Sequence, residues 1–123
     1  GSANTLCMME MLQPPRDHDG LLTDRRGRLW NDDTACYQIS AHNGPNSKAG
    51  DFGQCIDNAR MGWPCIRSTV NTPTLHMGSR SRHPGVVLVS FCDGSVRPIQ
   101  DSINLTTWAN LSGMADGTIV SLQ

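Results

Sequence analysis

The stretch VVLVSFCDGSVRPI, residues 86–99, constrains the fold more than any other part of the chain. Its first six residues are β-branched or apolar apart from one serine, which predicts a strand that is buried on both faces. An Asp-Gly pair follows, and this pair favours the tight turn of a β-hairpin. Pro98 in the return segment cannot donate to a strand ladder and belongs at a sheet edge. We therefore expect an antiparallel hairpin at the centre of the fold.

The other strand candidates are shorter. The run TLCMMEM at 5–11 is apolar with one glutamate, which predicts a buried strand, although a short helix would also suit its Met and Leu residues. Residues 27–31 and 35–40 are further strand candidates on either side of a DDT turn, and residues 118–122 predict a terminal strand.

The segment DSINLTTWANLSG at 101–113 predicts a short helix. Leu105, Trp108 and Leu111 recur every three residues and would form one apolar face. Asp101, Ser102 and Asn104 are each suited to cap the start of this helix, and Gly113 is suited to end it.

Residues 41–85 are polar, rich in Gly, Pro and Asn, and almost without periodicity. So long a loop in a compact domain is usually functional or held by crosslinks or ions. Cys55 and Cys65 lie within it and could close a small disulfide ring that contributes about 2–3 kcal/mol, which would indicate an oxidising compartment. Cys7 and Cys92 fall in apolar runs, where we expect buried thiols. The total of five cysteines leaves at least one thiol unpaired within the chain.

Together these elements predict one domain over residues 1–123 of the α+β class. It is rich in β-structure, with a small antiparallel sheet, long irregular loops and one short C-terminal helix.

Charge and motifs exclude several functions. The net charge is −1, and acidic residues flank Arg25, Arg26 and Arg28, so we expect a solvated turn there and no nucleic-acid partner. No apolar run approaches the roughly 18 residues that span a membrane. There is no G-x-S-x-G nucleophile motif and no glycine-rich phosphate loop, and the prediction is a non-enzymatic chain without catalytic residues.

His83 and Asp93 are residue types that catalyse or bind metal, but their spacing argues against a shared site. Nine residues lie between them, most of them extended, and ten steps of roughly 3.3 Å each place them on the order of 30 Å apart. We expect both to serve the two ends of the hairpin, with Gly94 in its turn.

The same residues carry a resemblance. His83, nine residues, then Asp93-Gly94 resembles the H-x9-DG signature of a planctomycete-type prepilin-like family, a domain of unknown function. The tail INLTTWANLSGMADGTIV, the leading GSANTLCMMEM and the loop PNSKAGDFGQCIDNARMGWPC are similar to further segments of that family. The chain departs from the family pattern at Val86 and Pro98, where a glycine and an aromatic residue are common.

The resemblance implies the C-terminal portion of a pilin-like or pseudopilin-like protein, whose full-length members begin with a cleavable leader and a long apolar helix. We therefore expect an extracellular or cell-surface structural protein that assembles with copies of itself and with other pilin-like subunits, by burying apolar and strand-edge surface. Terminal strands 5–11 or 118–122 could be donated to a neighbour.

The loops contain candidate metal ligands, and the predicted helix contains candidate glycosylation sites. Calcium is the one cofactor that the residue types suggest, with Asp17, Asp19, Asp51 and Asp57 as candidate ligands. Asn104 and Asn110 lie in N-x-S/T glycosylation sequons.

A binding module is the rival function. The aromatic side chains of Trp30, Tyr37 and Trp63 could stack on a sugar or a peptide, which would make the chain an extracellular solute- or glycan-binding module.

Overall fold

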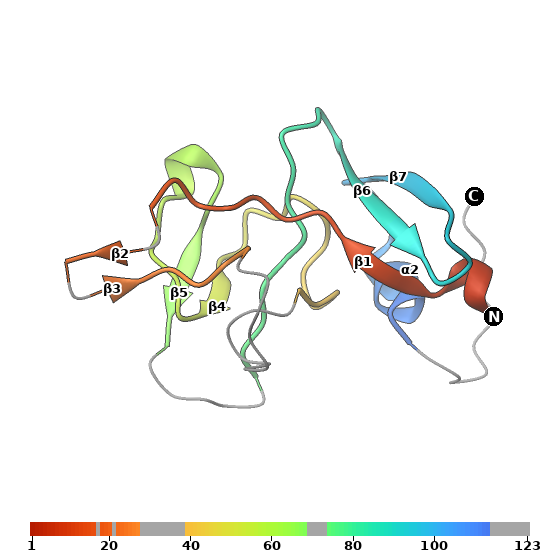
Figure 1. The fold of residues 1–123 in the computed structure, drawn as a ribbon, viewed down its shortest axis with the longest axis horizontal. Coiled ribbons are helices and arrows are strands. Elements are labelled where there is room, and N and C mark those ends of the chain that lie inside the picture. Colours follow the sequence, from red (N-terminus) through yellow and green to blue (C-terminus); the bar gives the residue numbers. More distant parts are fainter. Residues whose placement is uncertain (17, 21, 28–38, 69–73, 114–123) are drawn as a thin grey trace.

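A computed structural model describes residues 1–16, 18–20, 22–27, 39–68 and 74–113 of the chain (Figure 1). Its main sheet has three antiparallel strands in the order β1-β6-β7, formed by β1 (Leu6–Met9), β6 (Val86–Phe91) and β7 (Val96–Gln100). A short 3-10 turn, η1 (Ser2–Asn4), precedes β1. The hairpin predicted for residues 86–99 is confirmed, and the strand alternative for residues 5–11 is the correct one.

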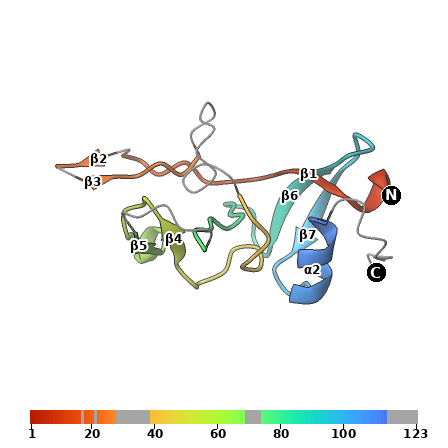
Figure 2. The ribbon, with the colours of Figure 1, turned by 90° about the horizontal axis from the view of Figure 1, so that it is seen from below.

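Burial along β6 alternates, and this corrects the prediction that both faces are buried. Val87, Val89 and Phe91 point into the core and are at most 2% exposed, whereas Leu88 between them is 39% exposed. The reason is that the structure packs a helix against one face of the sheet only, α2 (Leu105–Leu111) (Figure 2). The sheet therefore has an inner face toward α2 and an outer face that the other described parts of the chain leave open.

Helix α2 lies within the predicted segment 101–113 and begins after the last of its three candidate capping residues. Asn104 is its N-cap, and its Oδ1 accepts hydrogen bonds from the backbone N–H groups of Thr106 and Thr107. Trp108 and Leu111 are fully buried against the sheet. Leu105 is 59% exposed, so the predicted three-residue apolar face is wrong at its first position. A helix of seven residues presents two full turns at most, and Leu105 lies instead against Gly44 of the neighbouring loop.

The core between sheet and helix is small. It contains Val87, Val89, Phe91, Ile99, Trp108, Leu111 and Ala41, with Leu6, Met9 and Ile103 partly buried around it. The indole N–H of Trp108 donates to the carbonyl of Asn43 at 2.9 Å, which joins the loop at residues 41–47 to α2. The aromatic ring is thus buried with its one polar group satisfied.

The region predicted as a 45-residue loop contains regular structure. Strands β4 (Asp51–Gly53) and β5 (Cys65–Arg67) pair in parallel, with the 3-10 turn η2 (Ala59–Met61) between them. A small hairpin of β2 (His18–Asp19) and β3 (Leu22–Thr23) lies at the same end of the molecule, away from the main sheet (Figure 1). Strands of two or three residues are too short to show a hydrophobic period, so they could not be predicted from the sequence pattern.

The strands predicted at 27–31 and 35–40 fall largely outside the described residues, and the one at 118–122 falls wholly outside them. Within the described part of the chain, no helix has the length and apolar character needed to cross a membrane.

Candidate functional site

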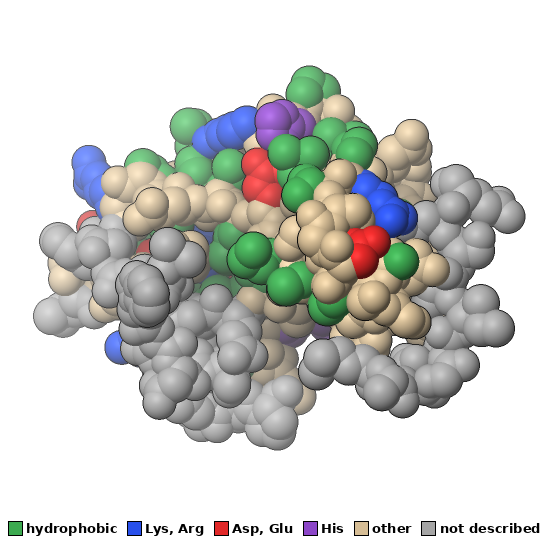
Figure 3. Space-filling model, turned by 45° about the vertical axis from the view of Figure 1, so that its right-hand side comes forward, with side chains coloured by type: hydrophobic (Ala, Val, Ile, Leu, Met, Phe, Trp, Pro, Cys, Tyr) green, Lys and Arg blue, Asp and Glu red, His purple; other side chains and the backbone are tan. Residues whose placement is uncertain are grey.

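The outer face of the main sheet carries three of the exposed large hydrophobic side chains of the described residues, Met8, Leu88 and Val96. The strand register places Met8, Ser90 and Val96 in one row across the sheet, and Leu88 and Pro98 in the next. Met8 is 68% exposed and Val96 is 65% exposed. On this side of the molecule, hydrophobic side chains lie between polar ones (Figure 3). We define Met8, Leu88, Val96 and Pro98 as the outer-face cluster.

One end of this face carries Glu10 close to His83. The Nε2 atom of His83 lies 3.5 Å from Oε1 of Glu10, and Oε2 of Glu10 accepts the backbone N–H of Leu88 at 3.0 Å. Glu10 therefore fixes the end of β1 to β6 and holds the ring of His83 beside it. This is where the structure places the histidine of the H-x9-DG motif, just before β6.

The other end of β6 carries Asp93 and Gly94. The Oδ1 atom of Asp93 accepts the N–H of Ser95 at 2.9 Å and its hydroxyl at 2.7 Å, and Gly94 has a φ of 84°, which favours glycine. These bonds from Ser95, followed by the charge of Arg97, lower the pKa of the Asp93 carboxyl. His83 and Asp93 thus serve opposite ends of one strand and do not meet.

Both edges of the sheet are poorly suited to strand addition. At one edge, the β1–β6 register shifts between Leu6 and Met8, which marks a β-bulge. At the other edge, β7 contains Pro98, which lacks an N–H. Because bulges and edge prolines discourage edge-to-edge pairing, the outer face is the better candidate for contacts with another molecule. Residues 6–9, considered above as a donated strand, are paired within the chain's own sheet.

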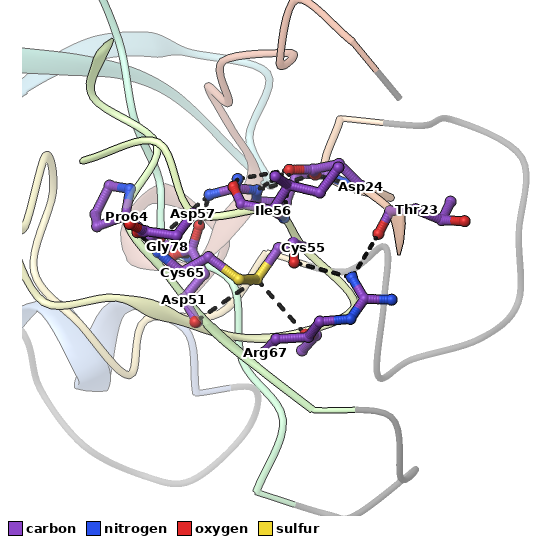
Figure 4. The surroundings of a disulfide bond; sticks show 12 residues. Thr23, Asp24, Asp51, Cys55, Ile56, Asp57, Pro64, Cys65, Arg67 and Gly78 are labelled. Atoms are coloured by element: carbon purple, nitrogen blue, oxygen red, sulfur yellow. Dashed lines mark hydrogen bonds and ion pairs between the residues drawn. A yellow bond between two sulfur atoms is a disulfide. The ribbon is translucent and has the colours of Figure 1, made fainter. Parts of the chain in front are cut away.

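The predicted Cys55–Cys65 disulfide is present, and it links the end of the β4 segment to β5 (Figure 4). Cys55 is fully buried. Around the disulfide, Arg67 donates from Nη1 to the carbonyls of Thr23 and Cys55, both at 3.1 Å. Arg67 of β5 therefore fastens the β4–β5 pair to the β2–β3 hairpin through Thr23.

A buried ion network that the sequence did not predict lies beside the disulfide. The guanidinium of Arg26 donates to Asp24 at 2.6 Å and to Asp51 at 3.0 Å, and all three side chains are at most 1% exposed. It also donates to the carbonyls of Ile56 at 2.7 Å and Pro64 at 3.2 Å. Burial acts against the charged form, but the bonds and charges of Asp24 and Asp51 outweigh it and raise the pKa of Arg26. The solvated turn expected at residues 25–28 is wrong for Arg26.

Arg80 completes the network from another part of the chain. Its Nη2 atom donates to Oδ1 of Asp51 at 2.9 Å and to the carbonyl of Ala49 at 3.0 Å, and its Nη1 atom donates to the carbonyl of Ser47. Asp51 is thus bound by two arginines and by the N–H of Gly78 at 2.8 Å. One signal in the sequence agrees with this network: nine of the ten basic residues are arginine, which suits buried, multiply bonded pairs better than lysine.

The candidate calcium ligands are only partly brought together. Asp51 is occupied by arginines, which makes it a poor ligand for a cation. Asp19 and Asp57 line one hollow of about 360 Å³ near the β2–β3 hairpin, but Asp57 accepts the N–H of Cys65 at 2.8 Å. Asp17 lies outside the described residues. Across the described ranges, no three His, Cys, Asp or Glu side chains are grouped to hold a metal.

Three other predicted site residues can be placed. Asn104 is exposed and Asn110 is half-buried, both at α2, and glycosylation of either stays a prediction. Trp63 is only 5% exposed, with its indole N–H bonded to the carbonyl of Leu12 and the guanidinium of Arg82 at 4.7 Å from its ring centroid. Its ring is therefore not free to stack on a ligand. Trp30 and Tyr37 lie outside the described residues.

Comparison with known proteins identifies the family. The sequence model described as "Protein of unknown function (DUF1559)" matches residues 1–106, which include the whole H-x9-DG hairpin and all three strands of the main sheet. The chain belongs to the DUF1559 family. No curated protein and no solved structure matches it. In this DUF1559 member, the matched region also contains the disulfide and the buried ion network, so the family match covers both ends of the described fold.

Proposed function

We propose that this DUF1559 member is a subunit of an extracellular or cell-surface fibre of the pilus or pseudopilus type, and that its copies associate through the outer-face cluster. The observation that carries the proposal is the exposure of Met8, Leu88 and Val96 on one open sheet face. Contiguous exposed apolar side chains in a soluble domain mark interaction surfaces. The H-x9-DG resemblance to prepilin-like proteins supports a role in assembly, and the disulfide suits an oxidising, extracellular site.

A copy of the same chain is the partner that this face fits best. The side chains at the centre of the face are uncharged, and the Glu10 carboxylate at its end is held within the subunit by the N–H of Leu88. A face of this kind does not repel its own copy, and the same patch can serve both sides of a two-fold contact.

The contact between two copies is expected to be weak by itself. Three strands about 4.8 Å apart, each about 17 Å long, present roughly 250 Å², whereas a standard stable interface buries about 800 Å² per partner. Association should therefore rise steeply with concentration and depend on several contacts per subunit in the fibre.

Charge placed in the middle of the face tests the proposal. Leu88→Asp and Val96→Asp each put a carboxylate where two copies would bury it, and an unpaired buried charge is strongly unfavourable. We expect sedimentation velocity over a concentration series to show association for the unmodified chain and monomers for both variants. Thermal unfolding checks that the variants remain folded.

Leu105→Asp is the matched control. It makes the same chemical change at a leucine that is 59% exposed but lies on α2, away from the outer face. An aspartate in the first turn of a helix is also electrostatically favourable. The control should associate like the unmodified chain. If Leu88→Asp and Val96→Asp also do so, the outer face is not the assembly surface.

A second candidate function rests on a basic hollow of about 600 Å³. Lys48, Arg60, Arg82 and His83 line it, with Asp101 as its one acidic residue. Within the described residues, Lys48, Arg60 and Arg82 form no ion pair. These basic groups would favour an anionic sugar. The hollow therefore supports a glycan-binding module whose ligand is an acidic sugar. A monomeric chain that binds a uronic-acid oligosaccharide, with loss of binding in Arg60→Ala, would favour this function over assembly.

A further inference from the structure

Two cysteines that the sequence suggested were buried are exposed and adjacent. Cys7 lies at the bulge of β1, and Cys92 directly follows β6. The N–H of Cys92 donates to the carbonyl of Thr5 at 2.9 Å, and its Sγ lies 3.8 Å from the carbonyl oxygen of Leu6. The sulfur of Cys92 is therefore held beside the peptide that leads into Cys7.

The strand pairing brings the two cysteines to the same end of the main sheet. Leu6 pairs with Phe91, and each cysteine follows one member of this pair, Cys7 at the β-bulge and Cys92 in the turn after β6. Both thiols are exposed, so neither is packed in the core. The two thiols are close enough to interact, because Cys7 is one of the groups that raise the pKa of Cys92, after desolvation.

We propose that Cys7 and Cys92 form a second disulfide, which is exposed and reducible and which fastens β1 to the turn of the H-x9-DG hairpin. Two S–H bonds break and one S–S bond forms. The two electrons and two protons pass to a disulfide oxidant, such as oxidised glutathione, which becomes two thiols through a mixed-disulfide step. In a compartment that maintains Cys55–Cys65, such an oxidant is present.

The proposed Cys7–Cys92 disulfide differs from the Cys55–Cys65 disulfide in its exposure to solvent. Cys55 is fully buried and Cys65 is half-buried, whereas Cys7 and Cys92 are both exposed. Since exchange depends on access, mild reductant should open Cys7–Cys92 before Cys55–Cys65. The Cys7–Cys92 disulfide is thus the more readily reduced of the two links.

Tryptic mapping of the full chain tests this directly, because every cysteine falls in a different tryptic peptide. Cleavage after Lys and Arg, except before Pro98, gives cysteine-containing peptides 1–16, 29–48, 49–60, 61–67 and 83–123. The chain is incubated with oxidised glutathione, its free thiols are alkylated, and the digest is analysed by mass spectrometry without reduction.

We expect peptide 1–16 linked to peptide 83–123, with the link lost in low dithiothreitol while 49–60 stays linked to 61–67. Because the thiolate is the reactive form and the pKa of Cys92 is raised, the link should form faster at about pH 9 than at about pH 7. In Cys7→Ser the link disappears and Cys92 is alkylated or glutathionylated, whereas Cys36→Ser leaves the link intact. Complete alkylation of Cys7 and Cys92 after oxidation, or a link from either one to peptide 29–48, would overturn the proposal.

Discussion

Replacement of Arg26 by methionine is the sharpest test of the buried network. Methionine has a similar length but no hydrogen-bond donor. The substitution removes the bonds to Asp24 at 2.6 Å and to Asp51 at 3.0 Å, and the bonds to two backbone carbonyls. Asp24 is 1% exposed, so its carboxylate would be left in the interior without its counter-charge.

The expected loss is large. Breaking a buried ion pair by removing one partner typically costs 3–5 kcal/mol, out of a total stability of about 5–15 kcal/mol for a domain. For a chain of this size, the Tm should fall by roughly 10–25 °C. Asp51 keeps Arg80 at 2.9 Å, so most of the loss arises at Asp24. Arg26→Lys should recover only part of the stability, because a single ammonium cannot reproduce the fork of donors.

Urea unfolding followed by circular dichroism, with the disulfides kept oxidised, measures the effect. Arg60→Met is the matched control, because Arg60 is exposed on η2 and should change stability by no more than about 0.5 kcal/mol. Asp24→Asn combined with Arg26→Met should cost less than the sum of the two single changes, because the uncompensated charge is gone. If Arg26→Met unfolds within about 0.5 kcal/mol of the unmodified chain, the network does not stabilise the fold.

Two further predictions concern the turn and the first disulfide. In the folded chain, the pKa of the Asp93 carboxyl lies below its ordinary value of 3.8. The carboxylate therefore stabilises the fold above that pH, and this stabilisation is lost as the pH falls through the folded-state pKa. The Tm gap between the unmodified chain and Asp93→Asn should therefore shrink below about pH 4, and a gap that widened in acid would contradict this assignment. Replacing Cys55 and Cys65 by alanine should lower the free energy of unfolding by about 3 kcal/mol, because the unfolded chain gains entropy when the loop is no longer closed. An unchanged urea midpoint would contradict this stabilising role of the disulfide.

The parts of the fold that the sequence predicted are those with local signals. The Asp-Gly turn, the β-branched run before it and the capping Asn104 each act over a few residues, and hairpin and helix begin where these signals lie. The Cys55–Cys65 disulfide could also be predicted, because a spacing of 10 residues within one loop limits the choice of partner.

The remaining features depend on long-range contacts. Arg26, Asp51 and Arg80 are far apart in sequence, and each alone looks like an ordinary surface charge. Whether β6 is buried on one face or on both depends on which other elements cover the sheet. The six residues of the strand do not determine this. Cys7 is exposed at the bulge of the edge strand β1 and Cys92 in the turn after β6, positions that the apolar runs around them do not reveal.

The central claim is that this chain assembles with copies of itself. Negative-stain electron microscopy of the protein isolated from its natural source, without refolding, tests it most directly. We predict regular filaments, whose formation Leu88→Asp should prevent. Dispersed particles of single-subunit size at high protein concentration would contradict assembly and would make the basic hollow the leading functional site.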